Sequence, residues 1–351
     1  MNFKNLLFIG LFASVLLQSC GEDVVEPVVE ADYKAELTNL TDNVIIATYQ
    51  DLADKAVVMF NEVKKLQAGP NAITLNNARQ AWRDCRAPWE SSEGFLFGPV
   101  DTDGVDPAID SWPVNIADLD GVLASTDELT EAYISASGDG VKGFHTIEYL
   151  LWGSDGSKEI LSFTAREFEY IVATVENLKN ETAGLANSWK SGYGNSLKTA
   201  GASGNSLFVS QKSALEQLAD AVVGICDEVF ATKIASPFGD PTPKPIEEES
   251  RFSHNSKNDF ANNIRSISNI YYGNYNVGNG GLSTIISKKD PVLDTQIKDA
   301  ILNAISSIEN ITGNFSDAIY HNRSDVETAK NAVESLHDLL KDEMQPVISN
   351  L

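Results

Sequence analysis

Apolar residues recur every three or four positions through most of the chain, with polar residues between them. A stretch with this spacing presents a continuous apolar stripe when it is helical. The clearest stripes are Ile45, Tyr49, Leu52, Ala56, Phe60 and Val63; Leu215, Leu218, Val222, Ile225 and Val229; Leu293, Ile297, Ile301, Ile305 and Ile308; and Val326, Ala329, Val333, Leu336 and Leu340. Strand-like alternation is scarce, so the pattern predicts an all-α protein built from helical bundles.

Two stretches interrupt the helical spacing. Residues 191–206 are rich in Gly, Ser and Asn, and the segment from Ser236 to Pro245 contains several prolines, which cannot continue a helix. A chain of 351 residues is too long for one typical core and suits two domains. We therefore expect an N-terminal helical bundle over residues 33–190, a linker at 191–206 and a C-terminal bundle over residues 207–351.

The first residues have the composition of an export signal. Lys4 precedes an apolar run that is too short to span a bilayer, and the run ends in Leu17-Gln18-Ser19-Cys20. This ending resembles a bacterial lipobox, in which the cysteine becomes the lipidated first residue. We expect residues 1–19 to be the signal peptide, Cys20 to carry the lipid and residues 20–32 to form an acidic tether. An ordinary secretory signal with a chance cysteine is the alternative.

The charge balance is strongly acidic, with 50 Asp and Glu residues against 26 Lys and Arg residues and a net charge of -24. This surface argues against nucleic acid as a partner, because phosphate binding needs basic residues. It also argues against attachment to anionic lipid through a basic patch. It is compatible with a cationic ligand, although a solvated acidic surface is the simpler explanation.

Beyond Cys20 the chain has Cys85 and Cys226, both in helix-like apolar stretches. Two distant thiols do not make a disulfide framework, so we expect two buried small hydrophobic side chains. A single disulfide between them is the alternative.

The segment from Gly143 to Gly153 sets a polar pair within an apolar helix. His145 and Glu148 are three residues apart, so on a helix both point to one face, within reach of one ion. An imidazole and a carboxylate suit iron or zinc better than Ca²⁺ or Mg²⁺. The apolar flanks predict that the pair is partly buried, and buried polar groups need partners. A site needs at least one further ligand, and a hydrogen-bonded structural pair is the alternative.

Two further segments depart from plain bundle helix. The stretch 81–101 mixes Trp, Arg and Glu with Pro88, which should kink or interrupt a helix. The stretch 249–260 has small hydroxyl and amide side chains ahead of a helix, among them Ser253 and Asn255. These side chains could face a pocket.

Together these segments resemble the imelysin family, also known as peptidase family M75. Its signature Gly-x-His-x-x-Glu is present as Gly143-Phe144-His145-Thr146-Ile147-Glu148. An earlier family stretch resembles Trp82, Arg86, Glu93 and Phe97-Gly98-Pro99, and further resemblance is found in Asp110-Ser111-Trp112-Pro113, Phe252 to Asp259 and Asn263 to Gly273. The resemblance runs from about Tyr33 to the C-terminus.

The resemblance implies two helical bundles with the signature in a cleft between them. It also implies a place in the periplasm or at the outer membrane and a role in iron-regulated uptake. We therefore expect a cell-envelope lipoprotein of the outer membrane, facing the periplasm or the cell surface and held to the membrane by lipidated Cys20. An iron-transport protein is a candidate partner.

The first hypothesis for the site is binding of iron, zinc or a metal-bearing ligand. His145, Glu148 and Glu93 would be the metal ligands, and Arg86 would orient a carboxylate or neutralise Glu93. The side chains expected to close the cleft are Ser253 and Asn255.

The second hypothesis is a metallopeptidase of the M75 type in which Glu148 is the catalytic residue. Hydrolysis by a metal needs three protein ligands, an open position and a general base. The sequence offers too few residues for all of these roles, so the count favours binding, and whether the chain is an enzyme stays open. The third hypothesis is a structural network of Arg86, Glu93, His145 and Glu148 at the domain interface, without metal.

Overall fold

The computed structural model describes residues 32–275 and 279–351, and every regular element in these residues is a helix. The prediction of an all-α fold is therefore confirmed. The predicted signal peptide, Cys20 and most of the predicted tether lie outside the described residues. Within the described part of the chain, no helix combines the length and the hydropathy needed to cross a bilayer.

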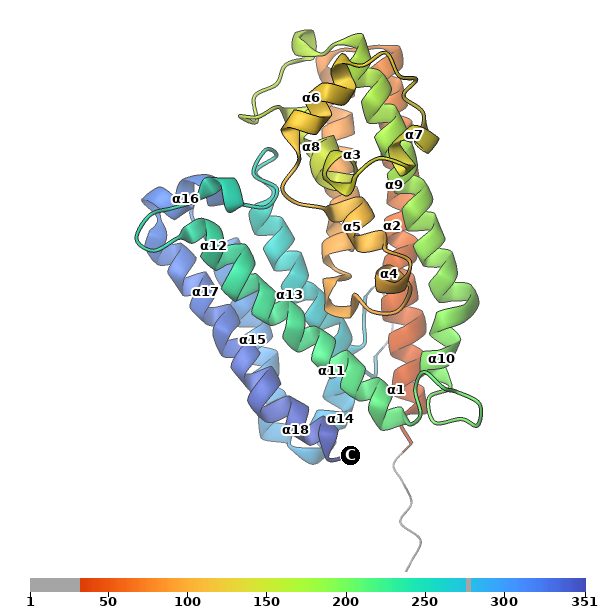
Figure 1. The fold of residues 1–351 in the computed structure, drawn as a ribbon. Helices are drawn as coiled ribbons and strands as arrows, with labels where there is room; N and C mark the ends of the chain where they lie inside the picture. Colours follow the sequence, from red (N-terminus) through yellow and green to blue (C-terminus); the bar gives the residue numbers. More distant parts are fainter. Residues whose placement is uncertain (1–31, 276–278) are drawn as a thin grey trace, which may run out of the picture. The chain divides into compact units, whose positions relative to one another are not determined.

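The long helices of the first half of the chain pack on one another (Figure 1). Helix α2 (Ile46–Ala68) packs against α3 (Ala72–Glu90) and α9 (Ala165–Ser188), and α8 (Gly143–Trp152) packs against both α3 and α9. Helices α3 and α9 begin at capping boxes, in which the side chain of the residue before the helix and that of its third residue satisfy free backbone N–H groups. These caps fix where both helices start.

The long helices of the second half form a second set. Helix α11 (Gln211–Glu228) and helix α15 (Pro291–Glu309) each pack against α13 (Ser256–Tyr272) and α17 (Arg323–Asp338). The two sets meet where α3 contacts α13, and the turn that follows α3 contacts α11 and α13. The candidate site lies at this meeting place.

Short helices connect the long ones. They are α1 (Lys34–Asn39), α4 (Pro99–Thr102), α5 (Val105–Asp110), α6 (Ile116–Ala124), α7 (Glu131–Ser135), α10 (Gly194–Lys198), α12 (Ala235–Phe238), α14 (Leu282–Lys289), α16 (Phe315–His321) and α18 (Gln345–Ser349). The 3-10 turns are Glu93–Phe95, Asp139–Val141, Ile160–Ser162 and Pro245–Glu247. The π-helical segments, each of which joins two α-helices end to end, are Leu40–Ile45, Trp189–Tyr193, Val229–Ile234 and Leu339–Met344.

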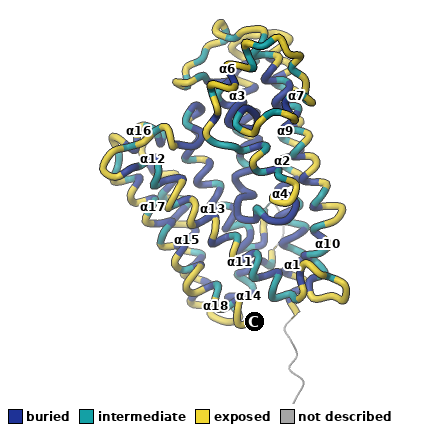
Figure 2. Tube along the Cα trace, in the orientation of Figure 1, coloured by how far each residue is buried: buried dark blue, intermediate teal, exposed yellow. Residues whose placement is uncertain are grey.

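The apolar stripes predicted from the sequence form the core. The inward sides of the long helices are buried (Figure 2), and the stripes of α11 and α17 are buried at every predicted position. Phe60 and Ile305 are exceptions in the other two stripes, because they are only partly buried at the edge of the core. Cys85 and Cys226 are buried and free, as expected for small hydrophobic side chains, and they do not form a disulfide.

The stretch 191–206, predicted as a linker, is helical in its first half. The segment Trp189–Tyr193 extends α9 as a π-helix, α10 follows directly, and irregular backbone leads from there to α11. Residues from Asp32 to Leu351 group into one compact unit. A domain division at this stretch therefore stays a prediction. Pro88, expected to kink or interrupt its helix, lies in the last turn of α3, which ends at Glu90.

Candidate functional site

The signature helix α8 starts at a glycine that allows close approach to α5. Gly143 has a φ of 75°, and a Cβ atom there would lie 2.3 Å from the carbonyl oxygen of Ile109. A residue with a side chain would be strained at this φ and would clash at this distance. The close approach places Asp110, the last residue of α5, beside His145 in the first turn of α8.

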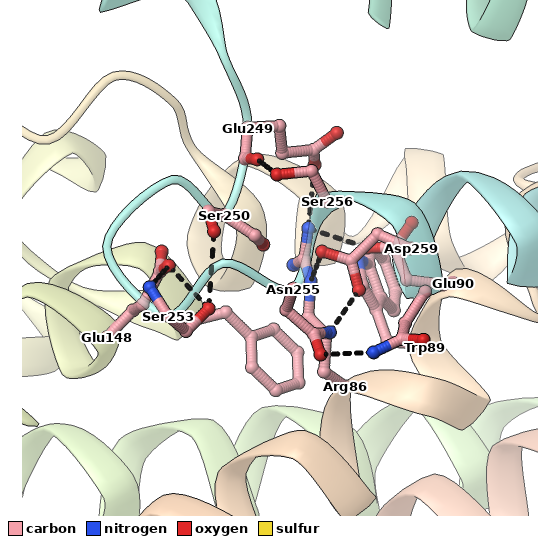
Figure 3. A network of polar contacts seen from close by, with 12 residues as sticks. Arg86, Trp89, Glu90, Glu148, Glu249, Ser250, Ser253, Asn255, Ser256 and Asp259 are labelled. Carbon is pink, nitrogen blue, oxygen red and sulfur yellow. Dashed lines mark hydrogen bonds and ion pairs between the residues drawn. The ribbon is translucent and has the colours of Figure 1, made fainter. Parts of the chain in front are cut away.

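His145 and Glu148 face one another on α8, as their spacing predicted. The Nδ1 atom of His145 lies 3.2 Å from Oε2 of Glu148, and both side chains are fully buried. The other oxygen of Glu148 accepts hydrogen bonds from the backbone N–H and the hydroxyl of Ser253, each at 2.7 Å (Figure 3). Glu148 therefore orients the imidazole and ties α8 to residues 248–255, the irregular segment before α13.

The opposite nitrogen of the ring faces two other carboxylates. The Nε2 atom of His145 lies 3.2 Å from Oδ1 of Asp110 and 3.6 Å from Oε1 of Glu249. One ligand atom from each of these three residues lies within 4.8 Å of the others. An imidazole nitrogen with two carboxylate oxygens is a donor set that zinc and iron accept.

Arg86 brings a buried positive charge into this group (Figure 3). Its guanidinium lies 2.5 Å from Glu90 and 2.6 Å from Glu249, contacts Asp110, and points its Nε toward Asp259 at 3.5 Å. The side chain is fully buried. These carboxylates lie on α3, on α5, in segment 248–255 and on α13, so Arg86 joins both sets of helices.

Lys233 supplies a second buried cation from the π-helical segment Val229–Ile234. Its Nζ lies 3.1 Å from Oε2 of Glu249 and 3.6 Å from Oε2 of Glu93. Arg86 was predicted to orient a carboxylate or to neutralise Glu93, and in the structure the cation nearest Glu93 is Lys233. Arg86 contacts Glu90 instead, one helical turn along α3.

Burial raises the pKa values of the deepest carboxyl groups. The pKa of Glu90 rises to about 8 although Arg86 and Lys233 act in the opposite direction, and the pKa of Glu93 rises well above its usual range. Burial also raises the pKa of Asp259 to about 6. Burial thus favours the protonated forms of Glu90 and Glu93, while Lys233 opposes it at both and Arg86 opposes it at Glu90.

Neighbouring charges overcome burial at Asp110 and Glu249. Burial alone would raise the pKa of Glu249, but Lys233, His145 and Arg86 hold it well below its usual value, and Arg86 and His145 hold the pKa of Asp110 low in the same way. Burial and Arg86 lower the pKa of His145, but its carboxylate neighbours outweigh them and raise it well above its usual value. The neighbouring charges thus favour the charged forms of His145, Asp110 and Glu249.

A solvent-open cavity of about 510 Å³ adjoins this cluster. The acidic side chains that line it are Glu93, Asp106, Asp110, Glu228, Glu247 and Glu249. Lys233 is the one basic residue among the described residues of the lining. The larger apolar side chains of the lining are Leu96, Trp112, Pro113 and Ile246. A lining of this charge attracts cations and repels anions.

The residues predicted from the sequence take different places around the cavity. Glu93 lines it, whereas His145 and Glu148 lie behind it. Ser253 and Asn255, expected to close a cleft, are buried in the network: Ser253 bonds to Glu148, and the Asn255 amide donates to Asp259 at 2.7 Å. The structure thus brings the predicted residues into one region. Glu93, His145 and Glu148 do not together make up one of the groups of described side chains whose donor atoms lie close enough to hold one ion.

Sequence reasoning missed Asp110, Glu249 and Lys233 as site residues. Asp110 had one signal, since it opens the family-like stretch Asp110-Ser111-Trp112-Pro113. Glu249 opened a segment noted for other side chains. Lys233 had no signal, because it follows a regular apolar stripe and looks like an ordinary solvated helix residue.

Comparison with known proteins confirms the resemblance to imelysins. A family model described as Imelysin matches residues 45–342. Iron-regulated protein A of Synechococcus elongatus is 28% identical over 349 residues, covering 95% of this chain and 91% of that protein. A crystal structure of a proposed iron-regulated protein A precursor from Parabacteroides distasonis has a TM-score of 0.81 and 26% identity, covering 91% of this chain and 94% of that one.

A second solved structure supports the fold alone. It is an imelysin-like protein from Psychrobacter arcticum with a TM-score of 0.76 and 14% identity, and the match covers 91% of this chain and 97% of that one.

Replacing Gly143 by alanine should destabilise the protein by on the order of 1–3 kcal/mol, because the methyl group would be strained at positive φ and would meet the Ile109 carbonyl. The urea midpoint of unfolding measures the effect. Gly184 in α9 is the control, since it has no neighbouring atom within 4 Å of an added Cβ. G184A should gain up to about 1 kcal/mol from helix propensity. Equal midpoints for the two variants would contradict the proposed close contact.

Replacing Arg86 by methionine should destabilise the protein by about 3–5 kcal/mol, because it leaves buried carboxylates without their cation. The control is R265M, which breaks the exposed ion pair between Arg265 and Glu309 and should cost about 0–1 kcal/mol. Urea unfolding of both variants provides the comparison. A loss in R86M no larger than that in R265M would show that Arg86 does not hold the network together.

Proposed function

Because the chain belongs to the imelysin family, we propose that it is a cell-envelope protein with an iron-related role that binds a metal ion or a metal-bearing ligand. The observation that carries the proposal is that Asp110 and Glu249 line the acidic cavity and also flank His145 Nε2. A cation that enters the cavity therefore meets carboxylate oxygens beside an imidazole nitrogen. The iron-related part rests on the similarity to iron-regulated protein A.

The donor groups fit a transition metal. Asp110, His145 and Glu249 would be the ligands, since their donor atoms lie within 4.8 Å of one another and combine nitrogen with oxygen. Glu148 takes a different role from the one first predicted. Its Oε2 lies 3.2 Å from Nδ1 of His145. A carboxylate in this position outside the ligand set commonly orients a metal-ligating imidazole.

Cations of the protein already neutralise these ligands. Arg86 bonds to Asp110 and Glu249, and the carboxylates around His145 outweigh burial and raise the pKa of its imidazole well above its usual value. A metal ion held by these ligands would have to compete with the protein's own cations for Asp110 and Glu249. Binding at this site would therefore be a competition between cations.

The geometry favours binding over hydrolysis of a peptide. A general base must come within hydrogen-bond reach of a water molecule or the substrate. Glu148 is fully buried, its two oxygens already serve His145 and Ser253, and it does not line the cavity. It is therefore poorly placed to act as the base of a peptidase.

Metal affinity of the purified full chain tests the proposal. We expect Zn²⁺ binding by calorimetry to weaken by about 10–100-fold in E148Q, because the imidazole loses its orienting partner, and by at least as much in H145A. His321, which is exposed and outside the cluster, provides the control variant H321A. Unchanged affinity in H145A, or no Zn²⁺ binding by the wild-type chain, would refute metal binding at this site.

We also propose that lipid on Cys20 holds the protein to the membrane. C20S should move the protein from the membrane fraction to the soluble fraction after cell lysis, because the variant has no cysteine to carry the lipid. Stable anchoring needs more than one acyl chain or a second membrane signal. C226S controls for the loss of a thiol elsewhere. The same membrane fraction in wild type and C20S would contradict anchoring through Cys20.

A further inference from the structure

The ammonium group of Lys233 is held among four carboxyl groups. Its distances are 3.1 Å to Glu249, 3.6 Å to Glu93, 3.8 Å to Glu90 and 3.9 Å to Glu228. Only 9% of the residue is exposed. Burying a lysine this deeply is costly unless partners surround the charge. The group therefore occupies a place shaped for a cation.

The local helix geometry positions Lys233 among these carboxyl groups. Helix α11 ends at Glu228 and continues as the π-helical segment Val229–Ile234 before α12 begins. A π-helical stretch within a helix is uncommon and often occurs at functional sites. Here Glu228, Thr232 and Lys233 all line the cavity.

Lys233 shares its partners with the metal-ligating groups. Two sets of side chains have donor atoms close enough for one ion: Asp110 with His145 and Glu249, and Asp110 with Glu90 and Glu93. Lys233 lies within 4 Å of Glu249 in the first set and of Glu90 and Glu93 in the second. An ion held by either set would be close to the ammonium and would be repelled by it.

We propose that Lys233 competes with the metal ion for these carboxylates. When the site holds a metal ion, the ammonium of Lys233 is displaced from Glu249 toward Glu228 at the cavity. The inference rests on the proposed function and adds the charge class of the ligand. An ion of two or more charges gains more from the same carboxylates than the ammonium does, whereas a monovalent ion gains no advantage over it. The site therefore selects multivalent cations.

The side chain suits this exchange. Lysine is a point charge on a flexible stem, so the ammonium can move while its backbone stays in place. Glu228 is about half exposed and already lies 3.9 Å from Nζ, so it provides a partner for the displaced group. Burial lowers the pKa of Lys233, but the four carboxyl groups outweigh burial and raise it well above its usual value. The ammonium would thus leave Glu249 by competition with another cation.

Zn²⁺ titration of the full chain by calorimetry tests the proposal. K233M, which keeps most of the stem and removes the charge, should bind Zn²⁺ about tenfold more tightly or better than the wild type. The control is K244M, since Lys244 is exposed and pairs with Glu247 in the same cavity lining without touching Glu249 or Glu93. K244M removes the same charge nearby and should bind as the wild type does.

Thermal unfolding of the same proteins adds a second readout. Without metal, K233M should unfold at a lower temperature than the wild type, because its carboxylates have lost their cation. Saturating Zn²⁺ should abolish this difference in unfolding temperature, since the ion would take the place of the ammonium. K233Q replaces K233M if the methionine variant does not fold.

The outcomes separate this inference from the proposed function. Zn²⁺ binding by the wild type that is unchanged or weaker in K233M would overturn the competitor role and leave metal binding intact. Binding by K233M alone would support the competitor role and count against metal binding by the native chain. The absence of binding in every variant would overturn both.

Discussion

The fully buried guanidinium of Arg86 joins parts of the chain that are distant in sequence. It extends from α3 to Asp110 at the end of α5, to Glu249 in segment 248–255 and toward Asp259 in α13. An uncompensated charge at this depth costs several kcal/mol, so α3 can bury Arg86 only when these carboxylates are in place. The packing of α3 on α13 and the surroundings of His145 both depend on this condition.

The site is acidic in composition, but its carboxylates lie against buried cations. Arg86 and Lys233 both contact Glu249, Arg86 contacts Asp110, and burial favours the protonated forms of Glu90 and Glu93. The affinity for a cation then depends on how strongly it interacts with the carboxylates compared with the protein's own cations. The ligand must interact with the carboxylates more favourably than the protein's own cations do, which makes its charge and geometry more important than the number of acidic residues.

The sequence predicted what depends on local spacing. The apolar stripes of α11 and α17 are buried throughout, and His145 and Glu148 share one face of α8, because helical periodicity determines both. The partners on the far side of the imidazole were not predictable in this way. Asp110 reaches His145 through the close packing at Gly143, and Glu249 arrives from a segment more distant in sequence.

Lys233 and Pro88 show two further limits of local reasoning. Lys233 faces the cavity from a π-helical segment, which leaves no mark on the pattern of apolar and polar residues. Pro88 was expected to kink or interrupt α3, and the helix continues for two residues beyond it to end at Glu90. The effect of a proline depends on where in a helix it lies, and the local sequence does not fix that place.

The bonds of Glu148 also have a mechanical consequence. One of its oxygens contacts the imidazole of His145 and the other accepts two hydrogen bonds from Ser253. This carboxylate therefore links α8 to the segment that carries Glu249. A displacement of this segment would therefore also shift the carboxylate that orients the imidazole. The positions of His145 and Glu249 are thus coupled through Glu148.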